Sequence, residues 1–320
     1  MNVVNVPIPM SKSSYPPPPP TPRPEERHRS VLLKETVAVV GPSSSGIYVD
    51  VTLGAGGHSE GLLAAGAGHV IGLDRDGAAL ELAQRRLARF GTKVDFVEAR
   101  FSQLRVELDR LGIDRVEGII ADLGVSSMQL DECERGMSFR REGPIDMRMD
   151  PEAGGETALE LIARVGDDDL ADIIFDLGEE RRSRRIARCI KQAFGAGELT
   201  TTRDLRRAII KAVGPNRQGN VDPATKTFQA LRMAVNDELR EIEALIDRAT
   251  AVLVPGGTLA VISFHSLEDR IVKRKLREPA WLIRSKKPVL PSADEVDDNP
   301  RARSAKLRFA ELRPGVPDRG

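Results

Sequence analysis

Cysteine is scarce in this sequence of 320 residues, which contains only Cys133 and Cys189. Two thiols so far apart cannot make a disulfide framework or supply the ligands of a structural zinc site. Long apolar runs are missing as well, and their absence argues against a membrane-spanning segment. We therefore expect a soluble cytoplasmic protein with no metal and no membrane partner, in which Cys189 lies in the core.

Net charge is also absent, because 48 lysine and arginine residues balance 48 aspartate and glutamate residues. No overall field therefore draws the chain onto nucleic acid. The basic residues nevertheless gather in three runs, which could neutralise phosphates locally or simply form solvated helix surfaces. These runs are Arg181, Arg182, Arg184, Arg185, Arg188 and Lys191; Arg270, Lys273, Arg274, Lys275 and Arg277; and Arg284, Lys286 and Lys287.

Proline is concentrated near the N-terminus, in the run 16–20 and at Pro22 and Pro24. Such runs cannot supply the backbone N–H groups of a helix or sheet and favour extended polyproline structure. We expect residues 1–27 to be a disordered tail that lacks the basic leader and apolar core of a secretory signal. Residues 314–320 are expected to be a second, short tail.

The most informative stretch is residues 47–59, where β-branched and aromatic residues typical of a buried strand run directly into glycines. Gly54, Gly56 and Gly57 bring backbone without side chains to the carboxyl end of the strand, where open α/β sheets bind ligands. The first amide groups of the following helix would point at that ligand. A dinucleotide fingerprint needs a third glycine where Ser59 stands, so the register argues against NAD. A Gly-rich turn can also merely pack a helix against a strand.

Three further predicted strands end in residues that could complete such a site. The strand at 69–73 leads to Asp74, an acid placed to bind a ribose, and the strand at 116–121 leads to Asp122. Between them, the strand at 93–97 leads to Phe101, whose ring could lie against a base or in the core. The ordered set of glycines, acid, aromatic and acid is more specific than any one member.

The middle of the chain contains no convincing strand and reads as a helical insertion. A polar segment at 129–150 is followed by helical patterns at 167–176, 179–194 and 203–213, the last with a capping box formed by Thr201 and Asp204. The predicted fold class is thus α/β, with helices inserted into a parallel sheet.

The sequence then returns to the sheet. Asp222 is expected to start one long helix that ends at Pro255, and Pro255-Gly256-Gly257 to turn the chain into a strand at 258–263. Ser266 and Asp269 have capping-box spacing just after this strand. A polar loop at 291–299 and a last strand at 306–311 complete the predicted elements.

Eight strings, in order, resemble the MraW/RsmH family of S-adenosylmethionine-dependent methyltransferases that act on cytosine N4 of small-subunit (16S) ribosomal RNA. They are DVTLGAGGHS (50–59), GLDRD (72–76), DLGVSSMQLD (122–131), GPIDMRMD (143–150), GEERRSRRIARCI (178–190), TFQALRMAVNDEL (227–239), ISFHSLEDRIVK (262–273) and NPRARSAKLR (299–308). The resemblance implies a class I (Rossmann-like) methyltransferase domain at 28–133 and 222–313, interrupted by a helical substrate domain at 134–221. It also implies S-adenosylmethionine as the cofactor and small-subunit ribosomal RNA or a 30S particle as the partner.

The family's cofactor contacts carry over by position to seven residues. They are Gly56, Gly57, His58, Asp74, Phe101, Asp122 and Gln129. The chain departs from the family where similar proteins usually have His and Arg, because Asp222 and Lys226 stand there. This difference puts in doubt an RNA contact by a histidine at that position.

Methyl transfer to an exocyclic amine requires alignment of two atoms and acceptors that hold the amino group. Residues 122–127 read DLGVSS and not the Asn/Asp-Pro-Pro-aromatic string common in DNA amino-methyltransferases. We therefore expect Asp146 and His265 to hold or deprotonate the amine, with the backbone carbonyls of Ser126 and Ser127 as the alternative.

The basic runs are the expected contacts to RNA phosphates. The residues concerned are Arg181, Arg182, Arg184 and Arg185 in the insertion and Arg270, Lys273 and Arg274 after the strand at 258–263. Two other classes of function stay open on the sequence, a small-molecule methyltransferase and an RNA-binding factor without catalysis. The sequence does not decide the oligomeric state, and a homodimer stays open too.

Overall fold

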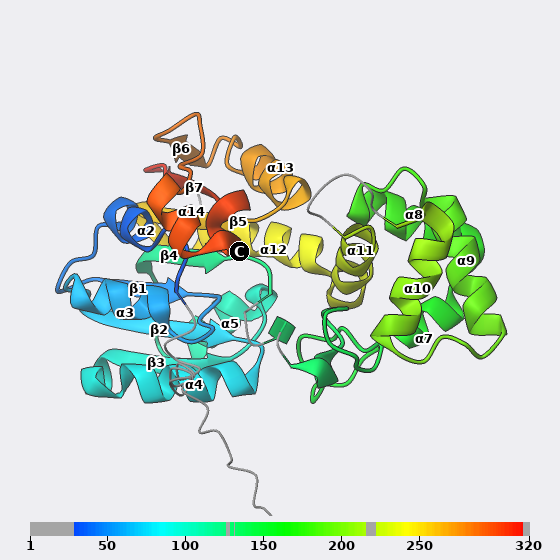
Figure 1. Cartoon of the computed structure of the whole chain (residues 1–320). Coiled ribbons are helices and arrows are strands. Elements are labelled where there is room, and N and C mark those ends of the chain that lie inside the picture. Colours follow the sequence, from blue (N-terminus) through cyan, green and yellow to red (C-terminus); the bar gives the residue numbers. More distant parts are fainter. Residues whose placement is uncertain (1–28, 126–128, 131, 216–221, 316–320) are drawn as a thin grey trace, which may run out of the picture.

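The computed structural model describes residues 29–125, 129–130, 132–215 and 222–315. The tail expected at 1–27, residues 316–320 of the tail expected at 314–320, and Ser126 and Ser127 lie outside these ranges. Within them the chain forms a sheet flanked by helices and, beside it, a group of helices (Figure 1). The predicted α/β class is confirmed.

Seven strands form one sheet in the order β3-β2-β1-β4-β5-β7-β6. Strands β1 to β5 run parallel, whereas β7 runs antiparallel to both β5 and β6. The strand order reverses between β1 and β4, which is where open α/β sheets bind ligands. The strands are β1 (Ile47–Asp50), β2 (His69–Asp74), β3 (Val94–Glu98), β4 (Val116–Asp122), β5 (Leu253–Ser263), β6 (Trp281–Ile283) and β7 (Lys306–Leu312).

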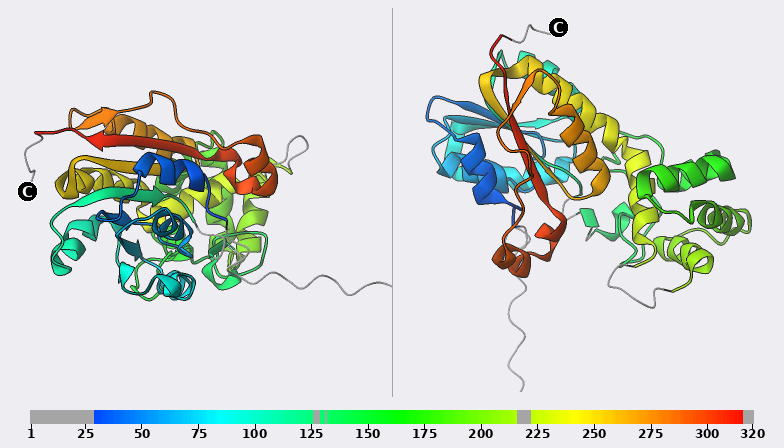
Figure 2. Two further views of the ribbon diagram at one scale, coloured as in Figure 1. Left: turned by 90° about the vertical axis from the view of Figure 1, so that its left-hand side faces the viewer. Right: turned by 90° about the horizontal axis from the view of Figure 1, so that it is seen from above.

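Helices cover both faces of the sheet, because its central strands are apolar on both sides. On one face, α2 (Leu33–Val40), α3 (Gly57–Ala64) and α4 (Gly77–Leu87) contribute to a core with Tyr48, Val70 and Ile120. On the other face, α5 (Leu104–Arg110), α12 (Glu238–Val252) and α13 (Ser266–Lys275) pack over Val49, Ile71 and Ile119. The right-hand view in Figure 2 shows α12 and α13 across the sheet from α2.

The helical part has a hydrophobic core of its own. It is built from α7 (Ala158–Arg164), α8 (Asp167–Gly178), α9 (Ser183–Gly195), α10 (Thr202–Val213) and α11 (Thr225–Asn236). The predicted capping box of Thr201 and Asp204 is present at the start of α10. Ile145 and Met147 from the polar segment, and Phe228 and Leu231 from α11, lie in this core, so it extends past the boundary predicted at residue 221.

The single long helix predicted from Asp222 to Pro255 is wrong. Helix α11 ends at Asn236 and α12 begins at Glu238, because Asp237 between them adopts a left-handed conformation with φ 50°. The sequence did not reveal this break, because the hydrophobic periodicity continues across it. Hydrogen bonds between Asn236 and the backbone of Met147 and Met149 stabilise the broken geometry. Asp222 lies before α11, where its Oδ2 accepts a 2.7 Å hydrogen bond from Arg206 and its Oδ1 accepts one from the amide of Ala224.

Two further details near the C-terminus differ from expectation. Strand β5 already begins at Leu253, so the expected turn at Pro255-Gly256-Gly257 lies within it. The predicted loop at 291–299 contains a short helix, α14 (Ala293–Asp298). Short 3-10 segments complete the described elements: η1 (Ala88–Lys93), η2 (Phe101–Gln103), η3 (Cys133–Arg135) and η4 (Pro300–Ser304).

Candidate active site

Asp74, at the tip of β2, joins the glycine-rich loop to the following helix. Its Oδ2 accepts a hydrogen bond of 2.8 Å from the amide of Gly54, and its Oδ1 accepts one of 2.9 Å from the amide of Asp76. Burial raises the pKa of Asp74 to about 6, against the effect of these two hydrogen bonds. A carboxylate has about four acceptor positions, so Asp74 can still accept hydrogen bonds from a ligand.

Gly56 and Gly57 are required by the turn itself. Gly56 precedes α3 with φ 80°, a conformation that favours glycine, and a Cβ there would lie 3.1 Å from Leu87. A Cβ on Gly57 would lie 2.0 Å from the Oγ of Ser30. The two glycines thus let α3 begin directly beside the edge of the sheet, where its first amide groups favour an anionic or polar ligand.

His58 is buried at the start of α3 and faces Asp122. Its Nε2 lies 3.0 Å from the carbonyl oxygen of Val31, and since a carbonyl only accepts, Nε2 carries the proton. Burial lowers the pKa of His58 to about 4, so the ring is neutral near pH 7. Its Nδ1 lies 3.7 Å from Oδ2 of Asp122, too far for a hydrogen bond.

Asp122, at the tip of β4, carries a buried oxygen that has no partner in the described part of the chain. This oxygen, Oδ1, makes no hydrogen bond there, and burial together with the charges of Asp50 and Glu268 raises the pKa of Asp122 well above the ordinary value. Asp50, which was not predicted from the sequence, is 1% exposed and accepts a 2.9 Å hydrogen bond from Ser59. Its burial raises its pKa to about 6. Its place directly before the glycine-rich loop was the available signal.

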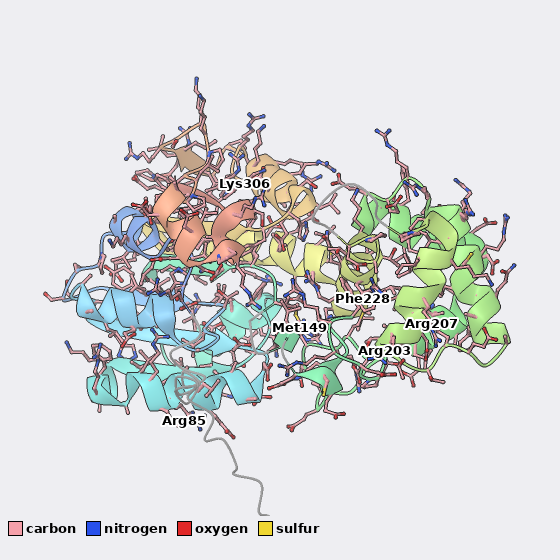
Figure 3. The ribbon with its side chains drawn as sticks, viewed as in Figure 1. Arg85, Met149, Arg203, Arg207, Phe228 and Lys306 are labelled. Atoms are coloured by element: carbon pink, nitrogen blue, oxygen red, sulfur yellow. The ribbon has the colours of Figure 1, made fainter. Side chains whose placement is uncertain are left out.

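A pocket with about 440 Å³ of empty space, part of it open to solvent, lies at this edge of the sheet. Phe101 and Leu123 give it apolar walls, and Met149 closes it from the helical side. Figure 3 places Met149 between the sheet and the helical part. The pocket is lined by Arg75, Ala99, Arg100, Phe101, Leu123, Gly124, Met149, Glu238, Glu241, Ile242 and Glu268.

Among these lining residues, only Phe101 was predicted from the sequence. Arg75 and Leu123 directly follow Asp74 and Asp122, so their positions were a usable signal. No local pattern in the sequence pointed to Glu238 and Glu241, because the break between α11 and α12 is what brings them to the pocket. The remaining predicted cofactor residue, Gln129, is 6% exposed and donates a 3.0 Å hydrogen bond to Asp76, just behind the pocket.

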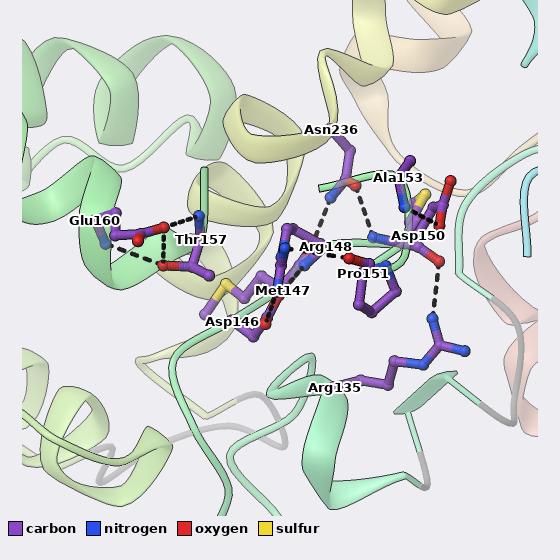
Figure 4. A network of polar contacts seen from close by, with 11 residues as sticks. Arg135, Asp146, Met147, Arg148, Asp150, Pro151, Ala153, Thr157, Glu160 and Asn236 are labelled. Atoms are coloured by element: carbon purple, nitrogen blue, oxygen red, sulfur yellow. Dashed lines mark hydrogen bonds and ion pairs between the residues drawn. The ribbon is translucent and has the colours of Figure 1, made fainter. Parts of the chain in front are cut away.

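Asp146 lies in the segment that leads to Met149 and is bound by Arg148. The guanidinium donates two hydrogen bonds, of 2.8 and 2.7 Å, to the two carboxylate oxygens, as Figure 4 shows. Burial tends to raise the pKa of Asp146, but these hydrogen bonds outweigh it and the pKa falls below its ordinary value. Asp146 is therefore an ionised carboxylate near pH 7.

His265, at the tip of β5, caps helix α13. Its Nδ1 accepts from the amide of Glu268, whose side chain in turn accepts from the amides of His265 and Phe264. The expected capping box of Ser266 and Asp269 is thus wrong by one residue, because the imidazole takes the place of a hydroxyl. His265 is not in the pocket lining, whereas its partner Glu268 is.

The two basic runs differ in their pairing. No ion pair involves Arg181, Arg184, Arg185 or Arg188 of the first run within the described part of the chain. Arg182 donates a hydrogen bond to the carbonyl of Val213. In the second run, Arg270 pairs with Glu179, Arg274 with Glu243 and Lys275 with Asp247.

The sequence profile of the MraW methylase family matches residues 25–313. The chain belongs to this family. The ribosomal RNA small subunit methyltransferase H of Sorangium cellulosum is 61% identical to it over 311 residues, 97% of each chain. The protein of that name from Nitrobacter winogradskyi is 47% identical and covers 89% of this chain and 90% of its own. An rRNA methylase structure from Streptococcus thermophilus covers 91% of this chain and 98% of its own, with a TM-score of 0.43 and 12% identity.

Membership of the MraW methylase family confirms the resemblance predicted from the eight strings. The pocket edge fits S-adenosylmethionine, the cofactor expected for this family. Among the described residues, the buried Oδ1 of Asp122 has no hydrogen-bond partner, which leaves an acceptor at this edge for a polar group of such a ligand. Within the described ranges, no group of three His, Cys, Asp or Glu residues is placed to hold a metal, and no helix is long and apolar enough to cross a membrane.

Proposed function

We propose that this protein transfers a methyl group from S-adenosylmethionine to the exocyclic N4 of a cytidine in small-subunit ribosomal RNA. The observation that carries this proposal is the meeting of the glycine-rich loop, Asp74, Phe101 and Asp122 at one edge of the sheet, in a chain of the MraW methylase family. Ribosomal RNA or a 30S particle would be the partner, and the cytoplasm the compartment.

Each group at the edge has a role that its contacts support. Asp74 would accept hydrogen bonds from the ribose hydroxyls, Phe101 and Leu123 would hold the adenine between them, and Asp122 would lie on the side of the polar end of the methyl donor. Gly56, Gly57 and His58 shape the loop, and Gln129 holds Asp76 beside the ribose acid. The bound cofactor supplies the methyl group, and the protein supplies alignment, which can lower the barrier by roughly 7 to 11 kcal/mol.

Asp146 and His265 are the proposed groups that hold the amine. Asp146 is ionised and therefore an acceptor. To bind the substrate, however, one of its oxygens would have to give up its hydrogen bond to Arg148. His265 touches Glu268, which lines the pocket, so its effect on the amine would pass through that carboxylate. Proton acceptance at either carboxylate is consistent with general base catalysis.

The helical insertion is the proposed RNA surface. Arg181, Arg184 and Arg185 lack ion-pair partners within the described residues, so each is available to a phosphate without breaking an ion pair. Arg270 and Arg274 would first have to leave Glu179 and Glu243. The target base must leave its stack to reach the methyl group. A homodimer is also proposed, but no step of this mechanism requires one.

The test is a methylation assay on unmethylated small-subunit particles, followed by nucleoside mass analysis. N4-methylcytidine is the expected product. Methylation of a small molecule without RNA binding would indicate a small-molecule methyltransferase. RNA binding without S-adenosylmethionine binding would indicate a non-catalytic RNA-binding factor.

A further inference from the structure

The backbone of Met149 is held from two sides at the wall of the pocket. Its amide donates a 2.8 Å hydrogen bond to Oδ1 of Asn236, and its carbonyl accepts a 2.8 Å hydrogen bond from Nη1 of Arg135. Figure 4 shows both side chains converging on this segment from different elements. We call Arg135 and Asn236 together the Met149 clamp.

The Arg135 side of the clamp reaches the cofactor edge. Its Nη2 donates a 2.9 Å hydrogen bond to Oδ1 of Asp76, whose own amide donates to the ribose acid Asp74. Arg135 and Asp76 are 12% and 3% exposed. A buried, hydrogen-bonded charge pair of this kind is costly to break from one side. The position of Asp74 is therefore linked to that of Met149 through two residues.

The Asn236 side reaches the helical insertion. Asn236 is 2% exposed, and its Nδ2 donates to the carbonyls of Met147 and Arg232 at 2.7 and 2.8 Å. Met147 has φ 64° and lies in the core of the insertion. The amide of Met147 also donates to the carbonyl of Arg135 at 2.9 Å. Met147 thus packs in the core of the insertion, and Met149, two residues later, lines the cofactor pocket.

We propose that the Met149 clamp couples cofactor binding to RNA binding, with Arg135 and Asn236 as positioning residues. A ligand that contacts both Asp74 and Met149 stabilises the segment that carries Met147 and Met149, and with it the position of the insertion. The insertion then presents its basic surface in one position. This inference rests on the proposed function, since it needs an RNA that binds the insertion.

The test measures the affinity of unmethylated small-subunit particles for the protein with and without saturating S-adenosylhomocysteine. Wild type should bind the particle at least about fivefold more tightly with the cofactor product present, the lower range of typical coupling. The same ratio must appear when particles are added and S-adenosylhomocysteine is titrated, because coupling is reciprocal.

Arg135→Ala and Asn236→Ala should bring this ratio towards one, and Arg135→Lys should restore part of it. Arg85→Ala, which removes an exposed arginine in the last turn of α4, away from Met149 (Figure 3), is the matched control. If Asn236→Ala fails to fold, the Arg135 variants alone decide the question.

An unchanged ratio in Arg135→Ala would overturn the coupling, as would a ratio of one in wild type that still methylates the particle. Failure of the proposed function looks different, because wild type would then bind S-adenosylhomocysteine without binding or methylating the particle at all.

Discussion

The amide of Gly54 and the carboxylate of Asp74 are joined by a hydrogen bond of 2.8 Å, although the two residues belong to different strand tips. The carboxylate of Asp74, the proposed ribose-binding group, is therefore already oriented by the glycine-rich loop. Because the same carboxylate also accepts from the amide of Asp76, loop, acid and helix α4 form one preorganised unit.

This unit predicts a pH dependence of cofactor binding. The pKa of Asp74 is raised to about 6, and a ligand that donates hydrogen bonds to the ionised carboxylate favours release of its proton. Affinity for S-adenosylmethionine should therefore fall as the pH drops below about 6, by up to about tenfold per pH unit. Calorimetric titrations between pH 5 and pH 8 measure this slope.

Asp74→Asn is the control for the pH prediction. It should bind more weakly than wild type at pH 8 and show a shallower dependence between pH 5 and pH 6. Part of the slope should persist, since the pKa of Asp50 is also raised to about 6. An identical slope in wild type and variant would show that Asp74 does not control the pH dependence.

A buried ion pair spans the break between α11 and α12, and its removal should greatly reduce stability. Arg232 donates hydrogen bonds of 2.7 and 2.8 Å to Glu238, and both side chains are nearly buried. Glu238→Gln would leave the guanidinium without its counter-charge and should lower the free energy of unfolding by about 3 to 5 kcal/mol. Glu243→Gln removes a much more exposed pair with Arg274 and should cost about 0 to 1 kcal/mol. Urea unfolding compares the two variants.

The proposed roles of Asp146 and His265 predict a kinetic effect separate from stability. Asp146→Asn and His265→Ala should bind S-adenosylhomocysteine as wild type does and lose about a hundredfold or more in kcat. Loss of the cap at α13 alone should cost His265→Ala about 1 kcal/mol of stability. Variants that are less stable but methylate at the full rate would leave both residues with structural roles only.

The pairing of the basic runs predicts unequal contributions to RNA binding. Replacing Arg181, Arg184 and Arg185 with alanine should reduce the slope of log affinity against log salt by about 0.7 for each phosphate that is no longer neutralised. Replacing Arg270 and Arg274, which are paired with Glu179 and Glu243, should reduce it less. Equal slopes in wild type and the triple variant would move the RNA surface elsewhere.

The sheet and its ligand edge could be predicted from sequence because they follow local patterns. Gly56, Asp74 and Asp122 each stand at or just after the end of an apolar strand, and parallel strands bring such tips together. The wall formed by Met149 and Glu238 could not be predicted in this way. Its geometry depends on Asn236, whose partners Met149 and Met147 lie 87 and 89 positions away along the chain.

The position of His265 illustrates the same limit on a smaller scale. Its neighbours Ser266 and Asp269 have the residue types of a capping box. Residue propensity therefore favours them over His265 and Glu268, the pair that forms the box. The imidazole forms the cap because the end of β5 places it, and not the hydroxyl, before the first turn of α13.

The most direct test of the proposed cofactor site is a crystal structure of the protein with S-adenosylhomocysteine. We predict that the ribose hydroxyls lie within hydrogen-bonding distance of Asp74 and that the adenine lies against Phe101 and Leu123. We also predict that the sulfur faces the side of Asp122. A ligand bound away from this edge of the sheet, or with its ribose distant from Asp74, would contradict the proposed site.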